Sequence, residues 1–157
     1  MKGQIQQVFI YILTIIVVGL ILLVGYKAII NIMEKSCDVE TTKFASSLEE
    51  SIGRYTDSGS FHTVDLKAPC ETLEVCFVDP DTTSINSGYA IIDDSVNAGI
   101  KQNIFLIKPG LIEPFGYFPS IDVQSNILCV ENTNGFIRMS FEGLGQKTRV
   151  TVEEVVN

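Results

Sequence analysis

Four cysteines and one histidine are the side chains in this 157-residue sequence that most readily do chemistry. The cysteines are Cys37, Cys70, Cys76 and Cys129, and none forms a CxxC pair or stands with the histidine at the spacing of a zinc site. All four follow a long apolar segment. An even number of cysteines beyond such a segment is typical of disulfides in an oxidising compartment. The sequence therefore predicts two disulfides and no metal centre.

Four cysteines allow three pairings, which strand geometry helps to rank. The segment Thr72–Asp79 has the pattern of a strand, and six extended residue steps would separate Cys70 from Cys76 by about 20 Å, whereas a disulfide needs Cα atoms within about 7 Å. That pair could bond only across a tight turn. We expect Cys76–Cys129 across neighbouring strands and Cys37–Cys70 joining the helix to the sheet.

No catalytic constellation is visible. A nucleophile–histidine pair would have to use His62, and Ser58–Ser60 beside it has the composition of a turn rather than a nucleophile elbow. Gly143–Gly145 is not a phosphate-binding loop, because no helix follows it. The acidic groups in Asp79–Asp81 and Asp93–Asp94 could offer oxygen ligands to Ca²⁺ but lack EF-hand spacing, so we interpret them as surface carboxylates. We expect no enzymatic activity and no cofactor.

The opening segment carries the strongest signal in the chain. From Gly3 to Tyr26 there is no charged side chain, and Val8–Tyr26 is almost wholly apolar. Nineteen helical residues span about 29 Å, close to the roughly 30 Å hydrocarbon core of a bilayer. We expect lipid or neighbouring subunits to cover this helix through Val8, Ile12, Ile15, Ile16, Gly19, Leu20 and Leu23.

The charges bear on partners and on orientation. From Ser36 onward 8 basic and 18 acidic side chains give a net charge of −10 (8 − 18), which disfavours nucleic acid as a partner. The positive-inside rule compares Lys2 with Lys27, Lys35 and Lys43 and favours a cytoplasmic head. The acidic, cysteine-bearing head favours export. We interpret the head as extracytoplasmic, at the cell membrane and cell surface.

The N-terminus also bears on processing. Cleavage behind the apolar segment is not expected, because the segment exceeds the 7–15 residues of a secretory signal and no small-residue site follows it. The start Lys2-Gly3-Gln4, followed by polar residues and the apolar helix, resembles the class III signal peptide of archaeal type IV pilin-like proteins. The resemblance implies cleavage between Gly3 and Gln4 by a prepilin peptidase. The leader of three residues is short for this family, and Val8 stands where the family often has an acid.

The remainder predicts an α+β architecture, in which a long N-terminal hydrophobic helix precedes a single antiparallel β-rich head. The parts expected are a leader (1–3), a hydrophobic transmembrane or assembly helix (4–35), an amphipathic helix (36–57) and the head (58–157). In the amphipathic helix Phe44, Leu48, Ile52 and Tyr55 recur at helical spacing, with Asp38 or Thr41 as a cap. The expected strands are Phe61–Leu66, Thr72–Val78 with Leu73, Val75 and Phe77 on one face, Asn103–Ile107, Gly116–Val123, Ile127–Val130, Gly135–Phe141 and Thr148–Val152.

Two shorter patterns complete the expected head. Ala90–Lys101 interrupts the strands with apolar residues at helical spacing and predicts a short helix. Gly135–Phe141 and Thr148–Val152 alternate apolar and polar residues around a glycine-containing linker, which predicts a hairpin with one wet face.

These features favour a structural subunit of a type IV pilin-like cell-surface filament, which self-assembles through its N-terminal helix and exposes its acidic head. The alternative is an uncleaved single-pass membrane protein whose head binds a partner. An exported membrane-bound enzyme is a third interpretation, for which no site is visible.

Overall fold

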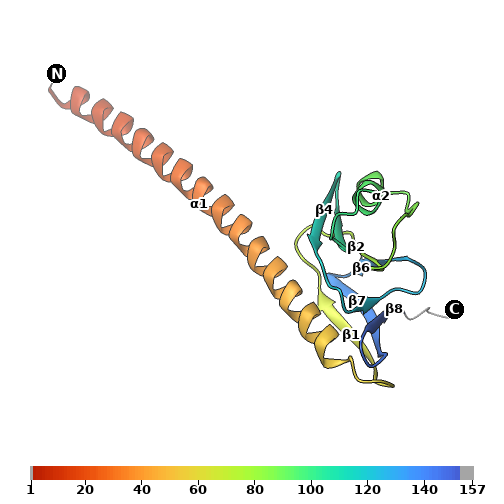
Figure 1. Cartoon of the computed structure of the whole chain (residues 1–157). Coiled ribbons are helices and arrows are strands. Elements are labelled where there is room, and N and C mark those ends of the chain that lie inside the picture. Colours follow the sequence, from red (N-terminus) through yellow and green to blue (C-terminus); the bar gives the residue numbers. More distant parts are fainter. Residues whose placement is uncertain (1, 153–157) are drawn as a thin grey trace. The chain divides into compact units, whose positions relative to one another are not determined.

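The structure, a computed structural model, describes residues 2–152, with side chains described from Val8 onward except that of Glu34 (Figure 1). The chain forms two compact units, Met1–Val39 and Glu40–Asn157. Helix α1 (Lys2–Arg54) supplies all of the first unit that is described and the opening segment of the second. The expected α+β class is confirmed: one long N-terminal helix precedes an eight-stranded, mostly antiparallel sheet.

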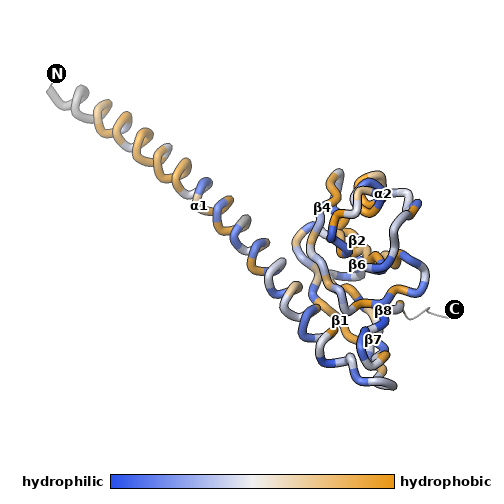
Figure 2. The backbone as a smooth tube through the Cα atoms, in the orientation of Figure 1, coloured by the Kyte–Doolittle hydropathy of each residue, from blue (hydrophilic) through white to orange (hydrophobic). Residues whose placement is uncertain are grey.

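The hydrophobic and amphipathic helices expected at 4–35 and 36–57 form one continuous helix, α1, which ends at Arg54. No glycine or proline lies between Gly25 and Gly53, so nothing in that stretch terminates the helix. Asp38 and Thr41, expected as caps, therefore lie inside the helix. Its hydropathy changes along its length, from apolar in the first half to mixed in the second (Figure 2).

The second half of α1 packs its predicted stripe into the head. Phe44, Leu48 and Ile52 are at most 5% exposed and belong to the main hydrophobic cluster, with Tyr55 packed against it. The spacing of 4 and 4 residues places these side chains on one helix face. The amphipathic pattern therefore identified correctly the part of α1 that closes the core of the head.

The head is built on one sheet with the strand order β4-β3-β2-β6-β7-β8-β5, and β1 pairs with β7 off this path. Helix α2 (Ala90–Asn97) follows β2. The strands are β1 (Phe61–Lys67), β2 (Glu74–Val78), β3 (Ile104–Lys108), β4 (Leu111–Gly116), β5 (Ile121–Asp122), β6 (Ile127–Thr133), β7 (Phe136–Gly143) and β8 (Thr148–Thr151).

Strand β2 is buried on both faces. Val75 and Phe77 enter the main cluster beneath α1, whereas Cys76 and Val78 enter a second cluster with Ile92 and Val96 of α2. Of the three residues expected on one face, Val75 and Phe77 lie there, but the prediction is wrong for Leu73, which precedes the strand and is 54% exposed. The sheet thus has hydrophobic packing on both sides.

One stretch of the sheet differs from expectation. Instead of one strand over Gly116–Val123, the chain forms β4, which ends at Gly116, and the two-residue β5, which begins after Ser120. Strand β4 contains Pro114, which an edge strand tolerates because its outer N–H needs no partner. Strand β5 runs parallel to β8, an exception to the otherwise antiparallel pairing. The predicted β7–β8 hairpin is confirmed, with Glu142 opposite Arg149.

Candidate membrane and assembly segment

The predicted membrane and assembly residues are all on the first half of α1, and their side chains have no cover within the chain. The apolar side chains among them are between 53% and 72% exposed, namely Val8, Ile12, Ile15, Ile16, Leu20 and Leu23, while Gly19 is half-exposed. Among the described residues this is the only helix long and apolar enough to cross a membrane, with a mean hydropathy of 3.0 over its most apolar window. So large an apolar surface requires a nonaqueous environment or partner helices.

One polar group within this segment, the Thr14 hydroxyl, is satisfied locally. The hydroxyl of Thr14 donates to the backbone oxygen of Ile10 at 2.8 Å, the usual way in which an apolar helix accommodates threonine. Gly19 and Gly25 have no atom within 4 Å of where a Cβ would stand, so the single chain assigns them no packing role. The expected cleavage positions Gly3 and Gln4 lie in the first turn of α1.

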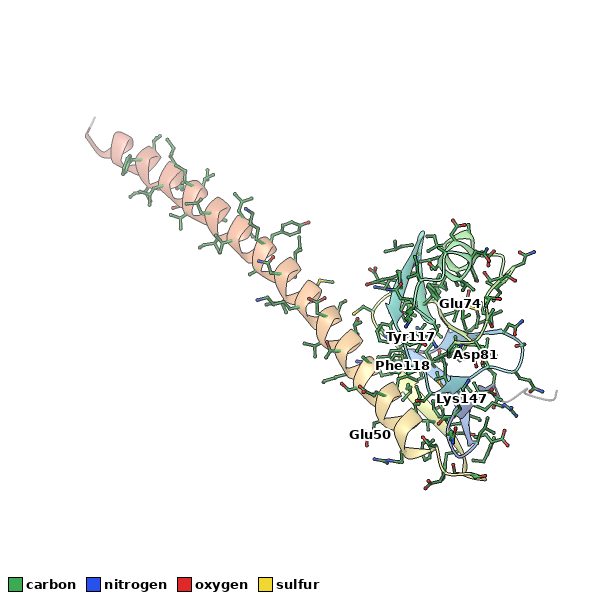
Figure 3. The ribbon with its side chains drawn as sticks, in the orientation of Figure 1. Glu50, Glu74, Asp81, Tyr117, Phe118 and Lys147 are labelled. Atoms are coloured by element: carbon green, nitrogen blue, oxygen red, sulfur yellow. A yellow bond between two sulfur atoms is a disulfide. The ribbon has the colours of Figure 1, made fainter. Side chains whose placement is uncertain are left out.

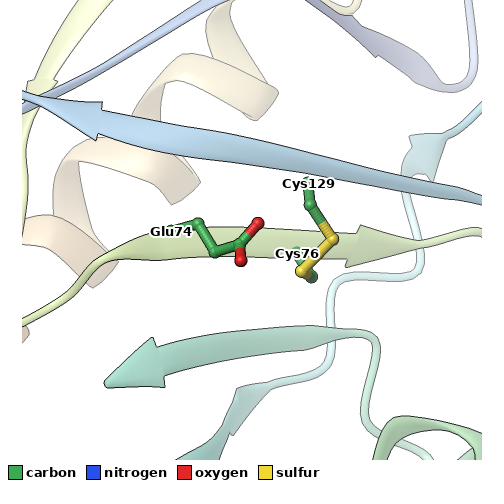
Figure 4. Close-up of side chains that lie close together, drawn as sticks. All are labelled: Glu74, Cys76 and Cys129. Atoms are coloured by element: carbon green, nitrogen blue, oxygen red, sulfur yellow. A yellow bond between two sulfur atoms is a disulfide. The ribbon is translucent and has the colours of Figure 1, made fainter. Parts of the chain in front are cut away.

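All four cysteines in the described structure are disulfide-bonded, as predicted. Cys76 of β2 and Cys129 of β6 are directly opposite each other, with Cα atoms 4.0 Å apart (Figure 4). Cys37 bonds Cys70, so both expected pairings are confirmed. Two disulfides beside a long apolar helix indicate an oxidising, extracytoplasmic environment for the head.

Glu74 lies beside the Cys76–Cys129 bridge and is the third member of a group whose candidate ligand atoms lie within 4.8 Å of one another (Figure 4). Both sulfurs are engaged in the disulfide, so neither is a thiolate ligand. The Glu74 carboxylate accepts a hydrogen bond from the Tyr89 hydroxyl, which raises the pKa of Tyr89 above its usual value; desolvation acts in the same direction. The group is therefore a structural link between β2 and the start of α2.

The other acidic residues weighed as ligands organise loops. Asp79 accepts backbone hydrogen bonds from Asp81 at 2.9 Å and from Val123 at 3.0 Å, while Asp81 pairs with Lys147 at 2.6 Å (Figure 3). The negative charge of Asp81 raises the pKa of Lys147, chiefly through this hydrogen bond. These contacts join the loop between β2 and α2 to Val123, just after β5, and to Lys147, just before β8.

Asp93 and His62 also have structural surroundings. The Asp93 carboxylate accepts hydrogen bonds from the backbone N–H of Ser87 at 2.8 Å and from its hydroxyl at 2.6 Å, just before α2. The exposed His62 ring stacks on Tyr55 with centroids 4.3 Å apart. The described hydrogen bonds pair His62 with no serine or cysteine, and the described interaction of its side chain is this ring stack.

The head contains a groove that sequence reasoning missed. It has a volume of about 640 Å³ and lies between the last turns of α1 and the segment that joins β4 to β5. Its walls include Glu49, Gly53, Phe115, Tyr117 and Phe118, and Figure 3 labels the last two. The aromatic run around Gly116 was the available signal. The pattern of this run predicts part of a strand, and a strand by itself does not place these side chains beside the helix.

Within the described structure, the features available for function therefore include an uncovered apolar helix segment, an acidic head with two disulfides, and the groove beside α1. This combination fits a membrane-anchored surface protein and is compatible with a pilin-like architecture. Comparison with protein-family models, with curated proteins and with solved structures finds no match to this chain.

Proposed function

We propose that this protein is a structural subunit of a type IV pilin-like cell-surface filament. The observation that carries the proposal is the division of α1: its segment Val8–Tyr26 is almost wholly apolar and its side chains are exposed, whereas the helix is packed into the head from Phe44. A helix that is hydrophobic all round requires burial in lipid or among like helices. A filament subunit is first held in the membrane and then packs into a bundle of helices. The apolar surface of α1 would be buried by lipid in the first state and by neighbouring helices in the second.

The head supplies the exposed surface in this proposal. Its closure by Cys76–Cys129 and by the α1 stripe makes it a compact unit that needs no partner to complete its core. The role is non-enzymatic, because the described reactive groups are engaged in disulfides, loop hydrogen bonds and ion pairs. Its partners are copies of itself, the membrane and a prepilin peptidase.

The mature N-terminus tests the processing that the proposal requires. Mass spectrometry of the protein purified from its native membrane should find a chain that starts at Gln4. A Gly3→Ile variant, blocked at the residue before the cut, should retain Met1, or begin at Lys2, and should form no filaments. A wild-type chain that retains Lys2 and Gly3 contradicts the pilin-like function.

Electron micrographs of cells test assembly independently. Filaments should be present with the wild-type gene and absent after its deletion. If the protein is cell-surface exposed but no filament depends on it, the second candidate stands: a single-pass anchored protein. The position of Lys27 supports this second candidate. Lys27 lies at the end of the apolar run, where its ammonium group can reach the headgroups.

A further inference from the structure

Strand β1 forms a free edge of the head sheet. Within residues 2–152 it pairs only with β7, in a register that is unbroken over all seven of its residues. The flanking backbone bonds are from Gly143 N–H to Ser60 and from Ala68 N–H to Gly135. Because antiparallel pairing alternates, the even-numbered residues of β1 bond to β7. The outward N–H and C=O groups, which have no described partner, are those of Phe61, Thr63, Asp65 and Lys67.

The other two edges of the sheet are protected, and β1 is not. Edge strands are commonly blunted by proline, by bulges or by short length. Strand β4 has Pro114 and a register shift opposite Ile104/Phe105, and β5 is two residues long. Strand β1 has neither proline, glycine nor bulge. It therefore presents a regular template for another strand.

The charged side chains of β1 are already neutralised within its own head. Asp65 receives two hydrogen bonds from Arg138, at 2.7 and 2.8 Å, and this contact lowers the pKa of Asp65. Lys67 pairs with Glu40 at 2.6 Å. These charges are thus not free to repel an approaching strand of the same sequence.

We propose that β1 pairs antiparallel with β1 of a second copy, about a two-fold axis at Val64, so that two heads share one continuous sheet. This register overlaps the whole strand. It sets Thr63 opposite Asp65 and Phe61 opposite Lys67, so each outward backbone group meets a partner. The partner of β1 is thus the same strand, β1, of a second copy.

The side chains of β1 are self-complementary in this register. Phe61 is 58% exposed and the Lys67 side chain is 68% exposed. Across the axis, Phe61 of each copy would lie against Lys67 of the other copy. A lysine over an aromatic ring is attractive, and the two-fold axis repeats the contact. At the axis the half-buried Val64 meets its own copy, an apolar pair of the kind that stabilises sheets.

The direction of β1 limits where this contact forms. Strand β1 returns along the end of α1, so pairing about the two-fold axis sets the Glu40–Arg54 segments of two copies antiparallel (Figure 1). Antiparallel heads suit molecules that meet from two filaments or two facing surfaces. This last consequence rests on the proposed cell-surface role, whereas the pairing itself does not.

Cross-linking tests the register. The full chain in detergent micelles carries no free native thiol in the described structure, so one cysteine can be added to it. Val64→Cys should form a covalent homodimer under mild oxidation about tenfold faster than Thr63→Cys, because only residue 64 is opposite itself and disulfides require close Cα atoms. Equal rates, or no dimer from Val64→Cys, overturn the proposed register.

A matched pair of variants tests the edge. Thr63→Pro removes an outward N–H and spares the bonds to β7, whereas Thr63→Ala removes the hydroxyl contact with Ser140 in the same way and keeps that N–H. Sedimentation in micelles should show dimers for wild type and Thr63→Ala and monomers for Thr63→Pro, with circular dichroism establishing that each is folded. Dimers of folded Thr63→Pro, or a monomeric wild type, overturn the proposal. Neither result depends on the mature N-terminus or on filaments.

Discussion

Gly143 lies directly against the carbonyl oxygen of Asp57: a Cβ built on Gly143 would stand 1.9 Å from that oxygen. The same glycine donates its N–H to Ser60 at 2.8 Å and accepts from Gly59 at 3.0 Å. The turn after α1 is therefore clamped to the end of β7. This contact fixes where the helix that fills the core leaves the head and where β1 begins.

Gly143→Ala should consequently destabilise the head by about 1–3 kcal/mol or more, because the added methyl overpacks a site walled by backbone. Gly53→Ala is the matched control, since nothing lies within 4 Å of its Cβ position and the residue is in α1. That change should stabilise slightly, by about 0.5–1 kcal/mol. Denaturant titration of the full chain in micelles, followed by circular dichroism, measures both. Equal effects of the two changes would contradict the close approach.

Leu48 tests the role of α1 in the core of the head. It is fully buried, and Leu48→Ala should cost about 2–5 kcal/mol through lost burial and the cavity left behind. Leu111→Ala, on an edge strand and 55% exposed, removes the same atoms from a wet surface and should change stability far less. If the two variants unfold at the same denaturant concentration, α1 does not complete the core.

The sequence predicted those parts of the fold that local patterning controls. The stripe of Phe44, Leu48 and Ile52 follows helical spacing, and the β7–β8 hairpin follows strand alternation. The Cys76–Cys129 bridge could be argued because the extended segment around Cys76 keeps Cys70 too far away to bond it. In each case the signal lies within one or two segments of the chain.

Features that depend on distant neighbours could not be predicted in this way. The alternation in β7 predicts a wet face for Ser140, yet Ser140 is buried where β1 pairs with β7, and the Thr63 hydroxyl lies 2.8 Å from the Ser140 hydroxyl. Strand β4 is not among the expected strands except at Gly116; it contains Pro114, which a strand tolerates at the edge of a sheet but not at its centre, and the edge position depends on the whole topology. The groove near Tyr117 likewise needs α1 and the β4–β5 segment together.

The Cys76–Cys129 disulfide should be a major source of stability in the head. It joins residues 53 apart, and loop-closure entropy predicts a contribution of about 4 kcal/mol for such a loop. A Cys76→Ala/Cys129→Ala double variant should lose about that much on denaturant titration. Unreduced wild type, unfolded in urea, should not react with a maleimide. Four reactive thiols in that assay would contradict both the oxidised state and the export of the head.

Lysine within the apolar segment should disrupt its function in either proposed role. Ile16→Lys/Leu20→Lys places two charges at side chains that are 56% and 57% exposed in the single chain and that would face lipid or neighbouring helices in the two roles. Each lysine costs about 2.5–3.5 kcal/mol at the centre of a membrane helix. Cell fractionation should find the variant released from the membrane fraction or absent from filaments. Val39→Lys, beyond the expected hydrophobic helix (4–35) and at a side chain that is 52% exposed, is the control and should fractionate as wild type.

Tyr89 makes a contribution to the stability of the head that should decrease as the pH rises. Its hydrogen bond to the Glu74 carboxylate is the main reason that its pKa lies above the usual 10.0, with desolvation second. The protonated phenol is therefore favoured in the folded head, so this stabilisation is complete below pH 10 and disappears as the pH rises through the raised pKa. Tyr89→Phe should unfold more easily than wild type at pH 8, and the two should converge at higher pH. The difference between their absorbance titrations near 295 nm isolates this phenol. A midpoint at or below 10 would show that the Glu74 contact does not form in solution.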